Sequence, residues 1–446
     1  MTNHFQYSNN GRLKTLKIRK IFAFFVLTVF LCISFFSVSG LIPIGNALNT
    51  EVEWTKAYGG ESTEYGYSVV QAADGGFLIA GQTFSFGAGG GDAWLVKTDG
   101  QGNLEWNKTF GESNADCFYW AIQTSDGGFA STGFAVPSRG YGGYDLCLVK
   151  FDATGNMLWN KTYGGAGDEM GLCLVQTSDG YVITGYTSSS GAGHKDLWLV
   201  KTDANGNMLW SKTYGGEFQE SGNSLVQTGD GGYAISGYVS NEIYGFDTDV
   251  WLLKTDANGN ALWNKTMSST NFVDAGLCLV ESVSGGFAIT GRSNYDLWVI
   301  RTDADGNQLW NKTFGGAEND IGHSVVEASD GGYIVVGATE SFGAGGGDAW
   351  LIELDENGNY LLNATYGDYW EDHGNSVVET SDGGYVIAGT TSSYGPTGGS
   401  NVWLMKIGSS VIPEFPSAPI TIVLLVASLT AALICKTKRK KAHSML

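Results

Sequence analysis

Acidic residues recur at fixed places along this sequence, and carboxylates are the side chains that hard cations and acid–base chemistry use. One set stands ten residues before a turn rich in Asp, Ser and Gly, and its members are Glu64, Asp116, Glu169, Glu220, Asp274, Asp320 and Asp372. A second set comprises Asp92, Asp145, Asp196, Asp249, Asp296 and Asp348, with Asn401 in the seventh place. If the first set met at one centre, its oxygens would suit Ca²⁺, which takes about six to eight oxygen ligands.

The even repetition of these acids also has a structural explanation. A carboxylate at the same place in every repeat can accept backbone N–H bonds and hold a loop of its own repeat. A single cation site does not require seven equal ligands, so the repetition favours this explanation. Ca²⁺ is the one cofactor that the residues suggest, and both explanations stay open at this stage.

Other signals of catalysis are sparse. Between the terminal segments the histidines are His194, His323 and His373, and they occupy different places in the repeat, which argues against a zinc site. The sequence contains no Gly-x-Ser-x-Gly motif of a nucleophilic serine. The residues that break the repeat where we expect its longer loops are Trp370, His373, His323, Arg139 and Arg292. This small set gives little support for an enzyme.

Five Asn-x-Ser/Thr sequons mark candidate glycosylation sites, at Asn107, Asn160, Asn264, Asn311 and Asn363. All five fall at the same place in the repeat. Glycosylation suits an exported surface protein. The triplet is also part of the repeat itself, however, and alternate side chains of its strand can face a neighbouring repeat. The sequence leaves both explanations open.

The repeat is clearest in a Trp-x-Lys segment that recurs at intervals of 47 to 53 residues, with Leu362 in the seventh tryptophan place. Within one copy, strand character is found at 223–227, 233–238, 249–254 and 262–266, and Gly-rich turns or longer loops separate these segments. Seven units of about 50 residues, each with four short strands, predict an all-β, seven-bladed β-propeller of four-stranded blades over residues 48–408.

The two ends of the repeat array complement each other. Residues 53–58 resemble a fourth strand with no strands before it, and residues 402–407 resemble a third strand with no fourth strand after it. We therefore expect the N-terminal strand to complete the last blade and close the ring, which removes an open sheet edge.

Twelve of the 14 tryptophans lie in the third or fourth strand of a repeat, where we expect them to fill the spaces between blades. The other two, Trp120 and Trp370, are expected near the loops that join successive blades. Cys147 stands in one tryptophan place, and Cys117 with Cys147 is the one pair that a disulfide would suit.

Segment 152–159, Asp-Ala-Thr-Gly-Asn-Met-Leu-Trp, resembles the Asp-Ala-x-Thr-Gly-x-x-x-Trp docking motif of PQQ-like β-propellers, a WD-like class of repeat protein. Other copies keep the acid, the glycine and the tryptophan, as at Asp203, Gly206 and Trp210. The resemblance implies the propeller fold. Quinoprotein dehydrogenases of this fold carry two adjacent cysteines beside the cofactor, and this sequence has no such pair, which puts quinone chemistry in doubt.

The net charge of −20 is unevenly distributed, because ten of the 25 basic residues lie in the two terminal segments. The part between them is strongly acidic, which disfavours nucleic-acid binding. At the N-terminus, basic residues precede an apolar stretch over 21–40, which predicts a signal peptide or signal anchor within 1–47. Small residues before Leu48 favour cleavage after Ala47.

A second apolar run over 418–435 is long enough to span a membrane as a helix, and the basic tail 436–446 is expected in the cytoplasm. The propeller would then lie outside the cell. The linker 409–417 contains Pro413, Glu414 and Phe415. This order of motif, apolar span and basic tail resembles the PEF-CTERM sorting signals of archaeal surface proteins. The resemblance implies a sortase-like processing enzyme, an archaeosortase, that replaces the span with another anchor.

These observations favour a membrane-tethered, non-enzymatic cell-surface scaffold that binds a protein, glycan or matrix ligand through its acidic, loop-rich face. The alternative is an extracytoplasmic enzyme that uses the same face, either a quinoprotein-like oxidoreductase or a polysaccharide-active lyase or hydrolase. An enzyme would require polar residues that break the repeat to meet at one point of that face.

Overall fold

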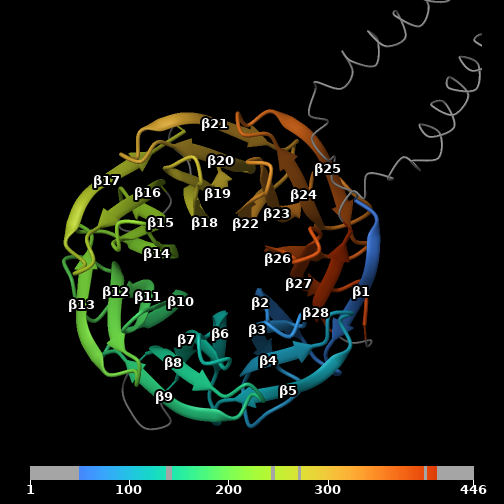
Figure 1. The fold of residues 1–446 in the computed structure, drawn as a ribbon, viewed down its shortest axis with the longest axis horizontal. Helices are drawn as coiled ribbons and strands as arrows, with labels where there is room; N and C mark the ends of the chain where they lie inside the picture. The colour runs from blue at the N-terminus through green and yellow to red at the C-terminus, as the bar shows by residue number, and fades with distance from the viewer. Residues whose placement is uncertain (1–49, 137–142, 243–246, 270–272, 396–398, 409–446) are drawn as a thin grey trace, which may run out of the picture. The chain divides into compact units, whose positions relative to one another are not determined.

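The computed structural model describes residues 50–136, 143–242, 247–269, 273–395 and 399–408, which form strands joined by turns and loops. Seven four-stranded antiparallel sheets stand around a central axis (Figure 1). The predicted all-β, seven-bladed propeller of four-stranded blades is confirmed. No helix long and apolar enough to cross a membrane occurs in these described ranges. The predicted segment 1–47, the linker 409–417, the span 418–435 and the tail 436–446 lie outside them.

Each blade begins with its innermost strand, and we name its strands A to D from the axis outward (Figure 1). Blades one to three consist of β2 (Glu64–Gln71), β3 (Phe77–Thr83), β4 (Asp92–Thr98) and β5 (Leu104–Phe110); β6 (Asp116–Gln123), β7 (Phe129–Ala135), β8 (Asp145–Phe151) and β9 (Met157–Tyr163); and β10 (Glu169–Thr177), β11 (Gly180–Thr187), β12 (Asp196–Asp203) and β13 (Met208–Tyr214).

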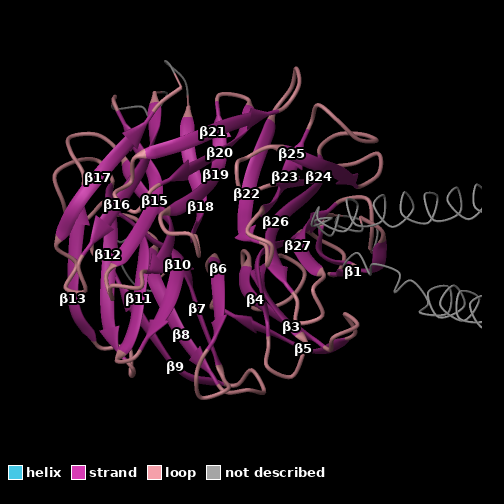
Figure 2. Cartoon of the chain, turned by 45° about the horizontal axis from the view of Figure 1, so that its top comes forward, coloured by secondary structure: helices cyan, strands magenta, loops and turns pink. Residues whose placement is uncertain are grey.

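Blades four to six continue this order with β14 (Glu220–Gln227), β15 (Tyr233–Ser240), β16 (Thr248–Thr255) and β17 (Ala261–Met267); β18 (Asp274–Glu281), β19 (Phe287–Ser293), β20 (Asp296–Thr302) and β21 (Gln308–Phe314); and β22 (Asp320–Glu327), β23 (Tyr333–Thr339), β24 (Asp348–Leu354) and β25 (Tyr360–Tyr366). All of these strands run between two faces that carry the connections (Figure 2). The loop-rich face carries the D–A and B–C loops, and the turn face carries the A–B and C–D turns.

The seventh blade is built from both ends of the repeat array. Its strands A to C are β26 (Asp372–Glu379), β27 (Tyr385–Thr391) and β28 (Asn401–Ile407), and its strand D is β1 (Val52–Tyr58). β1 pairs antiparallel with β28, so that Trp54 lies opposite Lys406 and Tyr58 opposite Val402. Figure 1 shows β1 on the outer side of β28. The predicted ring closure by the N-terminal strand is confirmed.

The strand-D tryptophans pack against the C–D turn of the next blade. Gly206, in the C–D turn of blade three, has a φ of +73°, and a Cβ added there would lie 2.6 Å from the Trp159 ring. The Tyr163 hydroxyl donates to the Gly206 carbonyl at 2.5 Å. Equivalent contacts join Trp54 to Gly102, Trp106 to Gly155, Trp210 to Gly259, Trp263 to Gly306 and Trp310 to Gly358. Positive φ and close approach both require glycine at these turns.

Leu362 replaces tryptophan at the one junction where no turn glycine is present to contact an indole. Leu362 is on the strand D of blade six, which faces blade seven. Strands C and D of blade seven come from opposite ends of the array, so no C–D turn and no turn glycine lie there. Instead, the Tyr366 hydroxyl donates to the Thr50 carbonyl at 3.0 Å. A leucine in place of tryptophan therefore follows from how the ring closes.

The strand-C tryptophans point toward the preceding blade. Trp94 is 2 % exposed and packs in one cluster with Tyr58 of blade seven and Phe77 of blade one. The prediction that these tryptophans fill the spaces between blades is therefore confirmed. Trp120 lies within strand β6, which follows a D–A loop, and Trp370 lies in the D–A loop before β26 and is 61 % exposed. Cys117 and Cys147 are buried and form no disulfide.

We predict that Gly206→Ala lowers the free energy of unfolding by about 3 kcal/mol, because the new methyl group combines strain at positive φ with overlap against Trp159. Gly127→Ala is a matched control, since Gly127 has a φ of +82° but no atom within 4 Å of the added carbon. Its expected loss is about 1 kcal/mol. Urea unfolding of the full chain in detergent measures both, and equal losses would show that the tryptophan contact does not restrict this position.

Candidate functional site

Each member of the first set of acids is the first residue of a strand A. Their exposed fractions lie between 0 and 7 %, so all seven are buried. Glu169 shows what the position does. Its carboxylate accepts the N–H of Gly165 at 2.7 Å and, on its other oxygen, the Thr187 hydroxyl at 2.8 Å and the N–H of Ser189 at 3.0 Å. One carboxylate thus joins the D–A loop before it to the B–C loop of its own blade.

The same pattern recurs around the ring. Glu64 accepts from Gly60, Thr83 and Ser85, and Asp372 accepts from Asp368 and Ser393. The second set of acids stands at or next to the start of strand C, and Asp92, Asp196 and Asp348 hold Gly-rich B–C loops. Asp196 accepts the N–H groups of Ala192 and Gly193, both at 3.1 Å. Both sets therefore fix loop conformation on the loop-rich face.

Members of the two sets approach each other across the junctions between blades. A Cβ added at Gly215 would lie 2.3 Å from Glu220 Oε2 and 2.7 Å from Asp196 Oδ1, so the two carboxylates flank one backbone residue. Burial, with a smaller contribution from Asp196, raises the pKa of Glu220 to about 7. The Oε2 atom of Glu220 is buried without a hydrogen-bond partner.

The junction between blades one and two has the same arrangement. Gly111 lies between Asp116 and Asp92, at 2.6 and 2.7 Å from the position of an added Cβ. Burial raises the pKa of Asp116 to about 6, and the charge of Asp92 adds to the increase. Between blades seven and one, the neutral Asn401 takes the place of the second acid beside Glu64.

The acids lie at separate junctions and do not converge on the axis. In the part of the chain that the structure describes, no group of three or more His, Cys, Asp or Glu side chains is arranged to hold a metal ion. The hydrogen bonds of these carboxylates are the loop-holding contacts that the repetition favoured. Their chemistry stabilises the scaffold that presents the loop-rich face.

Three of the residues that break the repeat, Arg292, His323 and His373, lie near one another at the end of the central channel. A recess of about 450 Å³ opens there, where strands A and C of blades four and five begin and their strands B end. Its polar lining includes Asn223, Tyr238 and the exposed Arg292, and its apolar lining includes Ala275 and Leu277. Asn223 is held in place because its side-chain amide donates to the Gly276 carbonyl at 3.0 Å.

Two histidines stand close to this recess. His323 Nδ1 lies 3.0 Å from the Gly374 carbonyl oxygen. Burial lowers the pKa of His323 to about 4, and the charges of His373 and Arg292 contribute to the decrease. His323 is therefore neutral at physiological pH. The structure thus brings together three of the five residues that the sequence singled out. Trp370 packs against Tyr369, and Arg139 lies outside the described residues.

The sequence did not single out Asn223 or Tyr238, although a signal was present. The middle position of strand A changes from blade to blade in an otherwise uniform repeat, as Tyr67, Tyr119, Leu172, Asn223, Leu277, His323 and Asn375. When the residue type varies at one position of a regular repeat and stays constant at the neighbouring positions, the variable side chain is not constrained by core packing and is available to form a binding surface.

The five sequon asparagines occupy the outermost strands β5, β9, β17, β21 and β25, and all five are exposed. The Oδ1 atoms of Asn107 and Asn264 accept a tryptophan N–H at 3.4 Å. The equivalent residues in blades three and seven are Ser211 and Thr55, which carry no sequon.

No protein-family model and no curated protein matches this chain. Solved structures with similar folds include the extracellular domain of a hybrid two component system from B. thetaiotaomicron, at 11 % identity and a TM-score of 0.42. The match covers 83 % of this chain and 42 % of the other, so this chain spans less than half of that protein's length.

Two further similar structures carry enzyme names. One is a fungal alcohol oxidase in complex with copper, at 13 % identity and a TM-score of 0.49, covering 81 % of this chain and 76 % of the other. The other is the Penicillium chrysogenum alpha-L-arabinanase complexed with arabinobiose, at 8 % identity and a TM-score of 0.48, covering 80 and 98 %. At these identities the likeness concerns the fold alone.

We predict that Glu220→Gln removes a loss of stability that the native chain undergoes as the pH rises. The pKa of Glu220 is about 7 in the folded chain and about 4.5 when unfolded, so the folded chain favours the protonated carboxyl group. The contribution of Glu220 to the free energy of unfolding is therefore most favourable below pH 4.5 and is lost between pH 4.5 and 7. At pH 8 the variant should be about 1 to 3 kcal/mol more stable than wild type, and at pH 4 equal to it.

The measurement is urea unfolding at both pH values. Glu217→Gln in the same loop is the control, because Glu217 is exposed and the substitution should change stability little at either pH. A Glu220→Gln variant that gains nothing at pH 8 would contradict the proposed role of the buried carboxylate pair.

We also predict glycosylation at the five sequons in a host that N-glycosylates exported proteins. Glycopeptide mass spectrometry should find modified Asn107, Asn160, Asn264, Asn311 and Asn363, and no glycan on the peptide that contains Ser211. Asn160→Gln should remove one glycan and leave the other four. Five unmodified asparagines, in a host that modifies a reporter sequon, would show that the triplet belongs only to the repeat.

Proposed function

We propose that this chain is a non-enzymatic cell-surface propeller that binds a glycan in the recess at the end of its channel. The observation that carries the proposal is the lining of that recess. An amide, a phenol and a guanidinium, from Asn223, Tyr238 and Arg292, surround an apolar floor of Ala275 and Leu277. A few fixed polar groups around apolar surface are typical of small-ligand sites, and about 450 Å³ lies within their usual range.

The charge of the chain narrows the class of glycan. The net charge of −20 repels polyanions, so a sulfated or uronic-acid polymer would meet an unfavourable field. Arg292 supplies donors for hydroxyl or ring oxygens, and Tyr238 and Asn223 supply both donors and acceptors. A neutral oligosaccharide, which offers hydroxyl groups without charge, suits this combination best.

The lining also favours binding over catalysis. Hydrolysis of a glycosidic bond generally uses two carboxyl groups, about 5 to 10 Å apart, on either side of the bond. No Asp or Glu is among the described residues that line the recess. The acids closest to it in sequence, Glu220 and Asp274, are buried at the starts of β14 and β18. These two carboxylates hold loops, and this structural role explains why they are present without any catalytic role.

The placement at the cell surface rests on the terminal sequences. A basic and apolar N-terminal segment, a linker with Pro-Glu-Phe, an apolar run and a basic tail support export, membrane tethering and processing by a sortase-like enzyme. The propeller would then face the medium with its glycans on the outermost strands. A ligand in the medium or in a neighbouring cell envelope reaches the recess without crossing a membrane.

We predict that Arg292→Ala weakens glycan binding at least tenfold, the effect expected from losing hydrogen bonds made by a charged donor. The full chain in detergent is screened against an array of neutral oligosaccharides, and the best ligand is then titrated by calorimetry. Tyr238→Phe should weaken binding about fivefold, as expected from losing one neutral hydrogen bond. Lys312→Ala, an exposed charge on β21, should change nothing.

Two results would contradict the proposed function. One is an array on which wild type binds no neutral glycan. The other is release of a cleaved or oxidised product during incubation with the bound ligand, which would establish the enzymatic alternative. Thermal shifts with Ca²⁺ and without it test the cation explanation in the same samples, since a shift lost on neutralising several first-set acids would support a metal role.

A further inference from the structure

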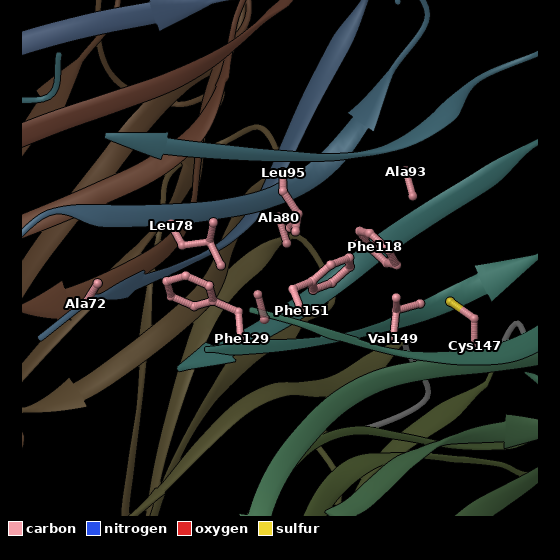
Figure 3. Close-up of a cluster of buried hydrophobic side chains, with 11 residues drawn as sticks. Ala72, Leu78, Ala80, Ala93, Leu95, Phe118, Phe129, Cys147, Val149 and Phe151 are labelled. Carbon is pink, nitrogen blue, oxygen red and sulfur yellow. The ribbon is translucent and has the colours of Figure 1, made fainter. Parts of the chain in front are cut away.

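Position 147 is the place where the strand-C tryptophan series is interrupted. Six blades have Trp94, Trp198, Trp251, Trp298, Trp350 and Trp403 at this position, and blade two has Cys147. All six tryptophans are at most 9 % exposed. Figure 3 shows Cys147 beside Val149 at one end of the cluster between blades one and two. A thiol fills much less space than an indole, so this junction differs from the six others.

The other junctions show what surrounds the indole. The Trp94 ring packs with Tyr58, on the strand D of the preceding blade, and its centroid lies 5.8 Å from that of Phe86. Its Nε1 donates to Asn107 Oδ1 at 3.4 Å. Trp251 donates to Asn264 at the same distance, and Trp403 donates to Thr55 at 2.6 Å. At these three junctions the indole N–H thus has an acceptor on strand D, and the Trp94 ring also has aromatic neighbours.

In blade two the equivalent residues line a cavity. Phe110 corresponds to Tyr58, and Asn160 corresponds to Asn107. Both line a space of about 650 Å³, together with Phe134, Val149 and Cys147. The place occupied by an indole elsewhere is bordered here by Phe118, which stands where the six other blades have glycine, and the rest of it is open. Phe110 and Asn160 keep the aromatic contact and the acceptor of the other junctions. Cavities left by replacing a large apolar side chain with a small one bind molecules of the missing shape.

Charged groups at the edge of the cavity indicate what else a ligand would carry. Asp116 and Glu112 supply carboxyl groups, and Lys161 supplies one ammonium group. The Lys161 Nζ already donates to Asn207 Oδ1, at 3.4 Å. Asp92 lies on the other side of Gly111 from Asp116 and adds to the negative potential. The field at this edge therefore favours a cation.

We propose that the cavity between blades one and two binds a small aromatic amine whose ring carries an N–H group. The ring packs against Phe110, in the place of the absent indole, its N–H donates to Asn160 Oδ1, and its ammonium group pairs with Asp116 and Glu112. This site is separate from the recess at the channel end. A glycan on Asn160 would be carried by Nδ2 and would leave Oδ1 available.

Calorimetry of the full chain in detergent at pH 8 tests the proposal with tryptamine as the probe. We expect one site per chain, at least tenfold weaker binding of indole-3-acetate, and about fivefold weaker binding of 1-methyltryptamine, which lacks the ring donor. Tryptamine should also bind more weakly as the pH falls through about 6, where Asp116 becomes protonated, and neutral indole should not change.

Two variants locate the site. Cys147→Trp restores the indole of the other blades and should reduce tryptamine binding at least tenfold while raising the melting temperature. Cys147→Met fills the cavity in part and should give an intermediate affinity, which keeps the test valid if the tryptophan variant does not fold. Trp94→Cys is the matched control, because it opens the equivalent place between blades seven and one and should increase the number of indole sites from one to two.

Absence of tryptamine binding to wild type would overturn the proposal. So would binding that is unchanged in both Cys147 variants, because the probe would then occupy another part of the chain. Equal affinities for tryptamine and indole-3-acetate would overturn the assignment of Asp116 and Glu112 as partners of the ammonium group.

Discussion

The contact between a strand-D tryptophan and the turn glycine of the next blade is the constraint on which the ring depends. A blade by itself is a four-stranded sheet with two apolar faces, and it is stable only when both faces are covered. At six junctions an indole packs on a glycine whose φ excludes other residues. At the seventh, Leu362 and the bond from Tyr366 to Thr50 replace this contact, because the closing blade has no C–D turn.

Most of the chemistry that the sequence displays serves this scaffold. The two sets of acids hold the loops at the start of strands A and C. Burial, with a smaller contribution from the neighbouring acid, raises the pKa of Glu220 and Asp116. The proposed binding sites lie where the repeat changes. One is the recess at Asn223, Tyr238 and Arg292, and the other is the cavity at Cys147. Uniform positions maintain the fold, and the changed positions are free to bind ligands.

Periodicity was sufficient to predict the blade number, the closure by β1 and the packing of most tryptophans, because each depends on spacing along the chain. It was not sufficient to find the recess or the cavity beside Cys147. Those features depend on which side chains of different blades contact each other, and a repeat pattern contains no information about such contacts. The pairing of Glu220 with Asp196 is of the same kind, since it joins two blades at a backbone residue that neither acid is next to in sequence.

Hydrogen exchange of the full chain, read by mass spectrometry, tests the role of the tryptophan contact most directly. If these contacts hold the ring, strands β25 and β26 at the junction with Leu362 should lose protection first, and the junctions with a tryptophan on a glycine should open later and together. Earlier exchange at the Trp159–Gly206 junction, between β9 and β12, would contradict this account.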